Sequence, residues 1–262
     1  MEGRSILAAM KDRTKTIQFD RGEPLLIAGA SGVVGLSLVR LMIEDGWKVF
    51  GSTRTPSKAE QLSKLGIVPV VFDVFDVQAV VSCLERIQPR FVFHQLTDLP
   101  DGLDPNLMPE ATLKNAKLRD EGTRNLVKAC HDVGVKRLVA QSLGFAYAPG
   151  ALPFAESHPL NVEAPGRAGI NARGVKNLED HVLGSQLDGI ALRYGRLYGA
   201  GTGFDIPNFA SPLHVEAAAQ AAKLALYYGR TGIYNLAEDD GTLDCTKAIV
   251  ELGFDPQFRI GV

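Results

Sequence analysis

Leu25-Leu-Ile-Ala-Gly29-Ala-Ser-Gly32-Val-Val-Gly35-Leu36 joins a short apolar run to an amphipathic helical pattern through a turn with three glycines. Glycine allows a tight bend and a close approach of the backbone, while the first turn of a helix offers unpaired N–H groups to a pyrophosphate. A strand, this glycine spacing and a helix in that order are typical of a dinucleotide-binding turn, the alternative being a turn that binds nothing. We predict that the turn binds cofactor phosphates through Gly29, Ala30, Ser31, Gly32, Val33, Val34 and Gly35.

Apolar runs of strand length recur along the chain between helical patterns. They cover residues 25–28, 49–52, 67–72, 91–94, 138–141 and 190–192, and a further short run over 233–236 lies in the segment after residue 195. This alternation predicts crossover units and a mostly parallel sheet. Because the runs are apolar almost throughout, we expect helices on both faces of the sheet. The predicted fold class is α/β, a Rossmann-type doubly wound parallel sheet with a small C-terminal substrate lobe.

The composition changes near residue 195. Residues 1–23 mix charges with one short apolar patch and are interpreted as an N-terminal extension. Residues 24–195 carry the alternation of strands and helices and are predicted to form an NAD(P)-binding Rossmann domain. Loops rich in Gly, Pro and Asn dominate residues 196–262, which are predicted to form a small substrate-side lobe rather than an independent domain.

The second predicted strand runs into Thr53-Arg54-Thr-Pro-Ser57-Lys58. An NAD site usually carries Asp or Glu near this point to accept from the ribose 2′-hydroxyl, and neither is present. The guanidinium of Arg54, with Ser57 and Lys58 after it, suits a 2′-phosphate. NADP is therefore the predicted cofactor. NAD is the second choice, since the alternative for Arg54 is a solvated arginine at the start of a helix.

The bulk composition excludes several classes of protein. With 45% hydrophobic and 22% charged residues the chain matches soluble globular proteins, and its net charge of −2 favours neither nucleic acid nor a membrane surface as partner. We expect a small-molecule substrate.

Three cysteines without a C-x-x-C pattern predict reduced thiols and a cytoplasmic location. The five histidines never recur at i, i+4 with a carboxylate, so no metal site is predicted.

Several short motifs follow the glycine turn in a definite order. They are Phe91-Val-Phe-His94, Glu121-Gly-Thr-Arg-Asn125-Leu, Gly134-Val-Lys-Arg-Leu-Val, Leu192-Arg-Tyr-Gly-Arg-Leu-Tyr198-Gly, His214-Val-Glu216-Ala-Ala and Gly232-Ile-Tyr-Asn235. With the turn, they resemble the extended and atypical branches of the short-chain dehydrogenase/reductase superfamily, the epimerase/dehydratase-like proteins. The resemblance implies that the helix bearing Asn125 packs under the site. It also implies that Asp73 and Val74 flank the adenine, while Gln95, Leu96 and Thr97 line the ribose and nicotinamide.

The catalytic Tyr-x-x-x-Lys pair of that family is missing. In the family, the lysine lowers the tyrosine pKa, so that the tyrosine can exchange a proton with the reacting oxygen. When the chain is aligned on Glu179, which resembles the family's helix glutamate, Asn171 stands at the tyrosine position and Val175 at the lysine position. Lys176 is one residue off, about 100° around the helix. The usual acid/base pair is therefore absent from this chain.

Tyr147 and Ser142, at the end of the fifth predicted strand, are the predicted proton donors, although each can also be a structural anchor. Tyr194, Tyr198, Arg173 and His158 are reserves. Two functions stay open: an oxidoreductase or epimerase/dehydratase-like enzyme that moves hydride between the nicotinamide and a small carbonyl or alcohol, and a non-catalytic NADP-binding sensor or regulatory protein. By analogy with family dimers, helices over 113–133 and 171–183 predict a possible homodimer.

Overall fold

The computed structural model describes residue 20 and residues 22–261, so nearly all of the predicted N-terminal extension lies outside the described residues. Seven parallel strands form one sheet in the order β3-β2-β1-β4-β5-β6-β9. The strands are β1 (Pro24–Ala28), β2 (Lys48–Thr53), β3 (Val68–Val71), β4 (Phe91–His94), β5 (Arg137–Leu143), β6 (Asp188–Tyr194) and β9 (Gly232–Leu236). The strand order reverses between β1 and β4, the topological switch point of a Rossmann-type sheet. The predicted fold class is confirmed.

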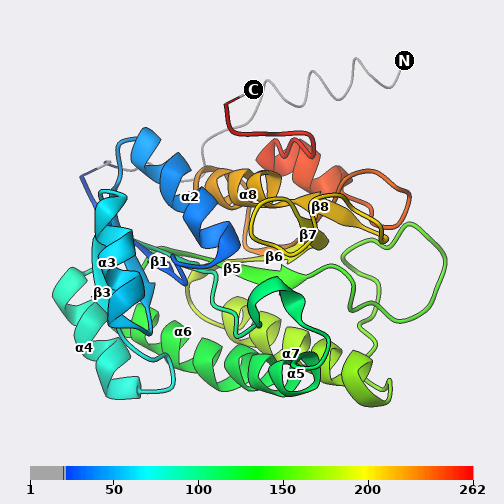
Figure 1. The fold of residues 1–262 in the computed structure, drawn as a ribbon, viewed down its shortest axis with the longest axis horizontal. Helices are drawn as coiled ribbons and strands as arrows, with labels where there is room; N and C mark the ends of the chain where they lie inside the picture. Colours follow the sequence, from blue (N-terminus) through cyan, green and yellow to red (C-terminus); the bar gives the residue numbers. More distant parts are fainter. Residues whose placement is uncertain (1–19, 21, 262) are drawn as a thin grey trace.

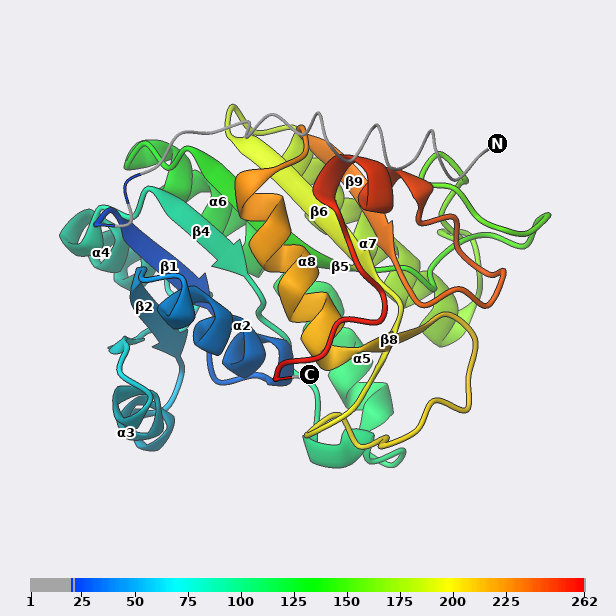
Figure 2. The ribbon, with the colours of Figure 1, turned by 90° about the horizontal axis from the view of Figure 1, so that it is seen from above.

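Helices cover both faces of this sheet (Figure 1). One layer contains α2 (Val33–Glu44) and α8 (Val215–Tyr227), which lie side by side in Figure 2. The opposite layer contains α4 (Val77–Ile87), α6 (Thr123–Asp132) and α7 (Gly166–Leu183), and α5 (Met108–Lys117) packs on α7. The remaining helix, α3 (Pro56–Lys64), follows β2 at the edge of the sheet.

Each face of the sheet has its own hydrophobic core. In β1, Leu25 and Ile27 join the core under α2 and α8, whereas Leu26 and Ala28 join the core under α4 and α6. All four side chains are fully buried. Successive residues of a strand point to opposite faces, so an uninterrupted apolar run is what a sheet buried on both sides requires.

The segment after residue 195 belongs partly to the main layers. Its helix α8 packs beside α2, and β9 extends the sheet next to β6. Two short strands, β7 (Arg196–Tyr198) and β8 (Pro212–His214), form a separate parallel pair. This small pair and its loops lie beside the carboxyl ends of the main strands, where they help to enclose the site described below.

The helix predicted over 113–133 is divided into two. The first part, α5, ends at Lys117, α6 begins at Thr123, and a π-helical turn, η2 (Leu118–Gly122), connects them. Such turns are frequent at functional sites. Arg119, which lies in η2, is only 7% exposed. A long charged side chain is therefore buried at a position where the helical pattern of the sequence did not predict burial.

Candidate functional site

A cavity of about 620 Å³ lies at the carboxyl ends of β1, β2, β4, β5 and β6. The predicted cofactor residues that line it are Gly29, Ser31, Gly32, Val33, Arg54, Lys58, Gln95, Leu96 and Thr97. In doubly wound sheets, ligands bind at this edge next to the switch point. The structure thus brings three separate predicted segments to one place.

The glycine turn has the backbone geometry that its sequence demands. Gly29 has a φ of +87°, and a Cβ atom built there would stand 2.6 Å from the carbonyl oxygen of Gln95. Gly32 is the N-cap of α2 and provides no side-chain cap, so the first N–H groups of the helix stay open toward the cavity. Gly35 packs directly on the backbone of Gly29 and Ala30. This cradle fits a pyrophosphate at a helix N-terminus.

Gln95 supplies a second sign that the cavity fits a cofactor. The side chain is 3% exposed, and its Nε2 lies 3.5 Å from the Tyr194 hydroxyl. Its Oε1 is buried and has no hydrogen-bond partner among the described residues. A buried acceptor without a partner costs about 1–3 kcal/mol, which a donor on a bound molecule would recover. The side chain therefore suits a hydroxyl or amide group of a dinucleotide.

Some of the predicted cofactor residues do not form the cavity wall: Ala30, Val34, Gly35, Asp73 and Val74. Asp73 Oδ1 accepts from the backbone N–H of Phe75 at 3.0 Å, which makes it a turn residue. Val74 is buried, and its carbonyl accepts from Asn125 Nδ2 at 3.1 Å, which ties α6 beneath this loop. The predicted contacts of Asp73 and Val74 with adenine stay predictions.

Arg54 meets a carboxylate across the mouth of the cavity. Its Nη2 lies 2.9 Å from Asp98 Oδ1, and both side chains are partly exposed. Hydrogen bonding to Asp98 is the main reason why the pKa of Arg54 is raised. Lys58 lines the same part of the wall. A 2′-phosphate at this point would have to compete with Asp98 for the guanidinium.

The structure does not bring the two predicted proton donors to the cavity wall. Ser142 is fully buried, and its Oγ donates to Glu179 Oε1 at 2.8 Å. The Tyr147 hydroxyl donates to Asn235 Oδ1 at 2.6 Å and accepts from Arg193 Nη1 at 2.7 Å. Both hydroxyls thus belong to one buried polar network: Ser142 lies in β5 and contacts Glu179 of α7, and Tyr147, in the loop after β5, contacts Asn235 of β9. Their role as proton donors stays a prediction.

Among the reserve candidates, only Tyr194 lines the cavity. It is 1% exposed, and burial raises the pKa of its hydroxyl, which makes it a poor proton donor near neutral pH. The others are engaged in holding loops. Tyr198 donates to Glu238, Arg173 donates to the carbonyl of Val162, and His158 bonds the carbonyl of Ala148.

Asn171 and Arg119 occupy the part of the wall where the family resemblance places catalysis. Asn171 lines the cavity from α7, whereas Val175 is fully buried behind it. Arg119 Nη1 lies 3.4 Å from Asn171 Oδ1. Arg119, together with Arg167 and Arg196 on the same wall, was not predicted from the sequence. The signals for Arg196 were its place in the motif that starts at Leu192 and its position a few residues after a predicted strand, at the edge where ligands bind.

His94, which ends β4 beside the cavity, is predicted to make stability depend on pH. Its Nδ1 accepts from the N–H of Leu96, its Nε2 lies 2.9 Å from Thr123 Oγ1, and burial, followed by the charge of Arg119, lowers its pKa to about 4. Between pH 6.5 and 4 the unfolded chain takes up a proton that the folded chain does not. The free energy of unfolding should therefore fall by about 2–3 kcal/mol between pH 7.5 and 4.5 through this group.

The measurement is urea unfolding of the wild type and His94→Gln at both pH values. Other groups titrate in this range, so the informative quantity is the difference between the two pH dependences. Equal pH dependence in the two proteins would show that His94 takes up its proton normally in the folded state.

Most of the residues around this cavity lie in a segment that matches the model of a known protein family. The family model described as NAD(P)H-binding matches residues 29–211, more than half of the chain. The chain belongs to this NAD(P)H-binding family. A Streptomyces sp. protein, 3-diazoavenalumate denitrifying reductase, is 39% identical over 229 residues, which are 87% of this chain and 72% of that protein. The 3-beta-hydroxysteroid dehydrogenase of Mycolicibacterium neoaurum is 32% identical over 124 residues, 47% of this chain and 32% of that protein.

Solved structures show the same fold. The UDP-glucose 4-epimerase of Thermotoga maritima, solved with UDP-glucose, matches with a TM-score of 0.72 at 18% identity over 90% of this chain and 94% of that one. The UDP-glucose 4-epimerase of Thermus thermophilus, solved with NAD, matches with a TM-score of 0.67 at 21% identity over 90% and 95%. The resemblance of the sequence to epimerase/dehydratase-like proteins is confirmed.

Within the described part of the chain, no helix has the length and apolar character needed to cross a membrane. Nor do the residues that the structure describes include a group of three or more His, Cys, Asp or Glu side chains able to hold a metal ion. The cytoplasmic location and the homodimer stay predictions.

Proposed function

We propose that this protein is an NADP(H)-dependent reductase whose small substrate binds in the same cavity as the cofactor. The observation that carries this proposal is that the cavity continues from the glycine turn to a second part lined by Phe145, Phe204 and Arg196. The bound cofactor supplies hydride, while the protein residues position the two reactants. A sensor of cofactor redox state needs the first part of this cavity but not the second.

The preference for NADP is supported by the charges at the end of β2. Arg54 and Lys58 line the cavity there, and Asp98, the one carboxylate that the described residues place on the wall, already pairs with Arg54. No Asp or Glu stands directly at the end of β2 to accept from a ribose 2′-hydroxyl. A guanidinium and an ammonium group suit a 2′-phosphate.

The residues at the catalytic position favour a substrate whose reduction does not require transfer of a proton to an oxygen atom. Asn171 does not titrate, and Arg119 stays protonated at neutral pH because burial lowers its pKa only to about 10. Reduction of a carbonyl requires a general acid, and Asn171, the amide at the tyrosine position, cannot be one. The Streptomyces relative is named as a denitrifying reductase of a diazo compound. A diazonium carbon that gains a hydride equivalent loses dinitrogen and leaves no oxyanion, so a diazo substrate fits this site.

We expect Arg54→Gln to weaken NADP⁺ binding by about tenfold or more, because the variant loses a charge-assisted bond to the 2′-phosphate. NAD⁺ binding should stay unchanged. Calorimetric titration of both cofactors checks this. An unchanged affinity for NADP⁺ would remove the basis for preferring it over NAD.

The converse change, Asp98→Asn, should tighten NADP⁺ binding by up to about fivefold, since a partly exposed ion pair of up to about 1 kcal/mol no longer competes for Arg54. Asp104→Asn is the matched control, because Asp104 lies in the same loop but outside the cavity wall. A gain with both variants would indicate a general charge effect and not release of Arg54.

Turnover is tested with NADPH and two carboxylates of similar size, 3-diazo-4-hydroxybenzoate and 4-formylbenzoate. We expect NADPH to be consumed with the first, with release of dinitrogen and formation of 4-hydroxybenzoate, and not with the second. Reduction of the aldehyde alone would contradict the diazo assignment. Tight NADPH binding without turnover of either compound would favour the sensor or regulatory alternative.

A further inference from the structure

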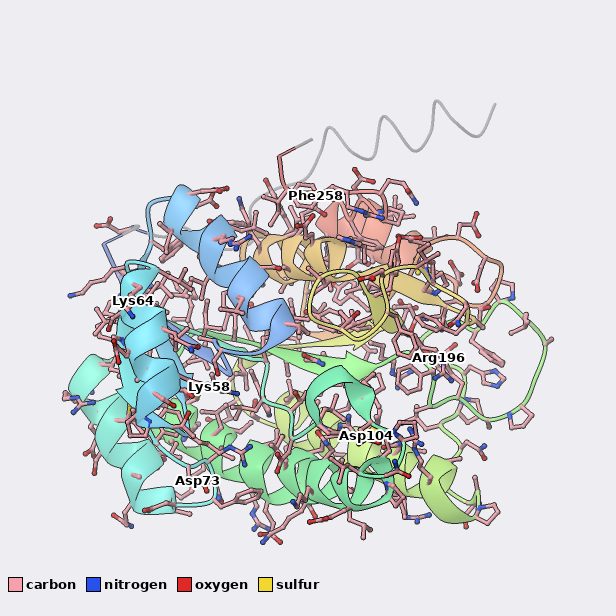
Figure 3. All side chains as sticks on the ribbon, in the orientation of Figure 1. Lys58, Lys64, Asp73, Asp104, Arg196 and Phe258 are labelled. Carbon is pink, nitrogen blue, oxygen red and sulfur yellow. The ribbon has the colours of Figure 1, made fainter. Side chains whose placement is uncertain are left out.

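Three arginines line the α7 side of the cavity. Arg119 comes from η2, Arg167 from the first turn of α7, and Arg196 from the residue that begins β7. Arg54 follows β2 and Arg196 closely follows β6, and three strands lie between these two, which corresponds to roughly 19 Å along the sheet edge. In Figure 3, Lys58 is labelled at α3 on the left and Arg196 on the right of the molecule. Arg196, and Arg167 whose charge acts on it, are therefore distinct from the cations at the 2′-phosphate end, while Arg119 lies beside Asn171 of α7.

The charge of this wall is not balanced by the protein. Among the described residues, no carboxylate lies within ion-pair distance of Arg119, Arg167 or Arg196, although the other arginines near the core are paired with Asp or Glu. Asp98, the only carboxylate that the described chain places on the cavity wall, is engaged by Arg54. The chain as a whole has a net charge of −2, so this local excess of positive charge is not a general property of the surface. A cavity of this kind concentrates anions.

The burial of Arg119 distinguishes this group of arginines from charges that merely lie on the surface. The residue is 7% exposed, and its side chain reaches the cavity wall beside Asn171. A buried cation without a counter-charge is costly, and an anionic ligand offsets that cost. Arg167 lies four residues before Asn171 on α7, so the two share one face of the helix.

Aromatic side chains surround the charged wall. The Arg196 guanidinium lies 4.5 Å from the centre of the Phe145 ring, which is 37% exposed. Phe204 and Phe209 form an edge-to-face pair with centroids 5.3 Å apart, and both line the cavity. Burial lowers the pKa of Arg196, and the charge of the nearby Arg167 lowers it further. A ligand here meets cations and flat apolar surfaces together.

We propose that Arg119, Arg167 and Arg196 bind a carboxylate of the substrate, and that the rest of the substrate is a flat, apolar body packed against Phe145. This inference rests on the proposed function, since it assigns the substrate part of the shared cavity. The planar fork of arginine matches a carboxylate, and aromatic walls match a conjugated ring. A nucleotide diphosphate would also attract arginines. However, Phe145, Phe204 and Phe209 give this part of the cavity a large apolar surface, which suits an aromatic body better than a ribose.

The test compares 2-naphthoate with its neutral amide, 2-naphthamide, by calorimetric titration of the protein saturated with NADP⁺. We expect the carboxylate to bind about tenfold or more tightly than the amide. Arg196→Gln and Arg119→Gln should each weaken 2-naphthoate binding by about tenfold and leave 2-naphthamide binding unchanged. Arg124→Gln, which removes an exposed arginine of α6 outside the cavity, is the matched control and should change neither.

Equal affinity for the two probes, or 2-naphthoate binding that Arg196→Gln leaves intact, would overturn the proposal. Binding of UDP that depends on Arg196, together with no binding of 2-naphthoate, would overturn it in favour of a diphosphate. The affinity for NADP⁺ is measured separately in each variant. If the protein bound no NADP⁺, the proposed function would fail. The same comparison of 2-naphthoate with 2-naphthamide on the cofactor-free protein would still show whether the three arginines bind a carboxylate.

Discussion

Replacing Glu179 by alanine should lower the free energy of unfolding by about 3–5 kcal/mol, the cost of leaving a buried arginine without its partner. Glu179 is 4% exposed and Arg193 3%, and Arg193 Nη2 lies 2.7 Å from Glu179 Oε2 while its Nε lies 2.8 Å from Oε1. Ser142 donates to the same carboxylate, and Tyr147 bonds the same guanidinium. One substitution therefore leaves several buried donors unsatisfied on β5 and β6. Urea unfolding measures the change.

Asp180→Ala is the matched control for this prediction. Asp180 is the next residue of α7, and it pairs with Lys176 on the exposed face, where both side chains are more than half exposed. Such pairs contribute about 0.3–0.5 kcal/mol. Losses of similar size in the two variants would show that the buried network contributes no more than a surface pair, which would remove our structural explanation for Ser142 and Tyr147.

Gly29→Ala is expected to impair both the fold and cofactor binding. The φ of +87° costs an alanine about 1–2 kcal/mol, and the new Cβ would meet the carbonyl oxygen of Gln95, a backbone atom that cannot turn aside. Backbone shifts of this kind cost about 1–3 kcal/mol, so the total loss in the free energy of unfolding should be about 2–5 kcal/mol. Because the shift moves the phosphate cradle and Gln95 together, NADP⁺ affinity should fall as well.

Gly66→Ala separates conformational strain from the clash. Gly66 has nearly the same φ, +83°, but a Cβ there has no neighbour within 4 Å. It should cost only about 1–2 kcal/mol and leave NADP⁺ binding unchanged. Thermal or urea unfolding, with calorimetry for the cofactor, distinguishes the two variants. If Gly29→Ala behaved like Gly66→Ala, the close approach of the turn to Gln95 would have no role in binding.

The part of the cavity next to the glycine turn was largely predictable because its residues follow strand ends. Gly29 and Gly32 stand at the end of β1, Arg54 at the end of β2 and Gln95 at the end of β4, and parallel strands bring such positions to one edge. The part of the cavity lined by arginines was not predictable in the same way. Arg119 is turned inward by the π-helical turn, and Arg167 lies in a first helical turn that the sequence pattern placed outside its helix.

The sequence by itself determined the alternation of strands and helices, the glycine turn and the absence of the Tyr-x-x-x-Lys pair, because these are local patterns read from neighbouring residues. Tertiary structure alone decided which side chains surround the position of the missing pair. It enclosed Ser142 and Tyr147 in the Glu179–Arg193 network, and it gathered cations from η2, α7 and β7 on one wall. Those contacts join residues that are far apart in the chain, and no local period encodes which of them meet.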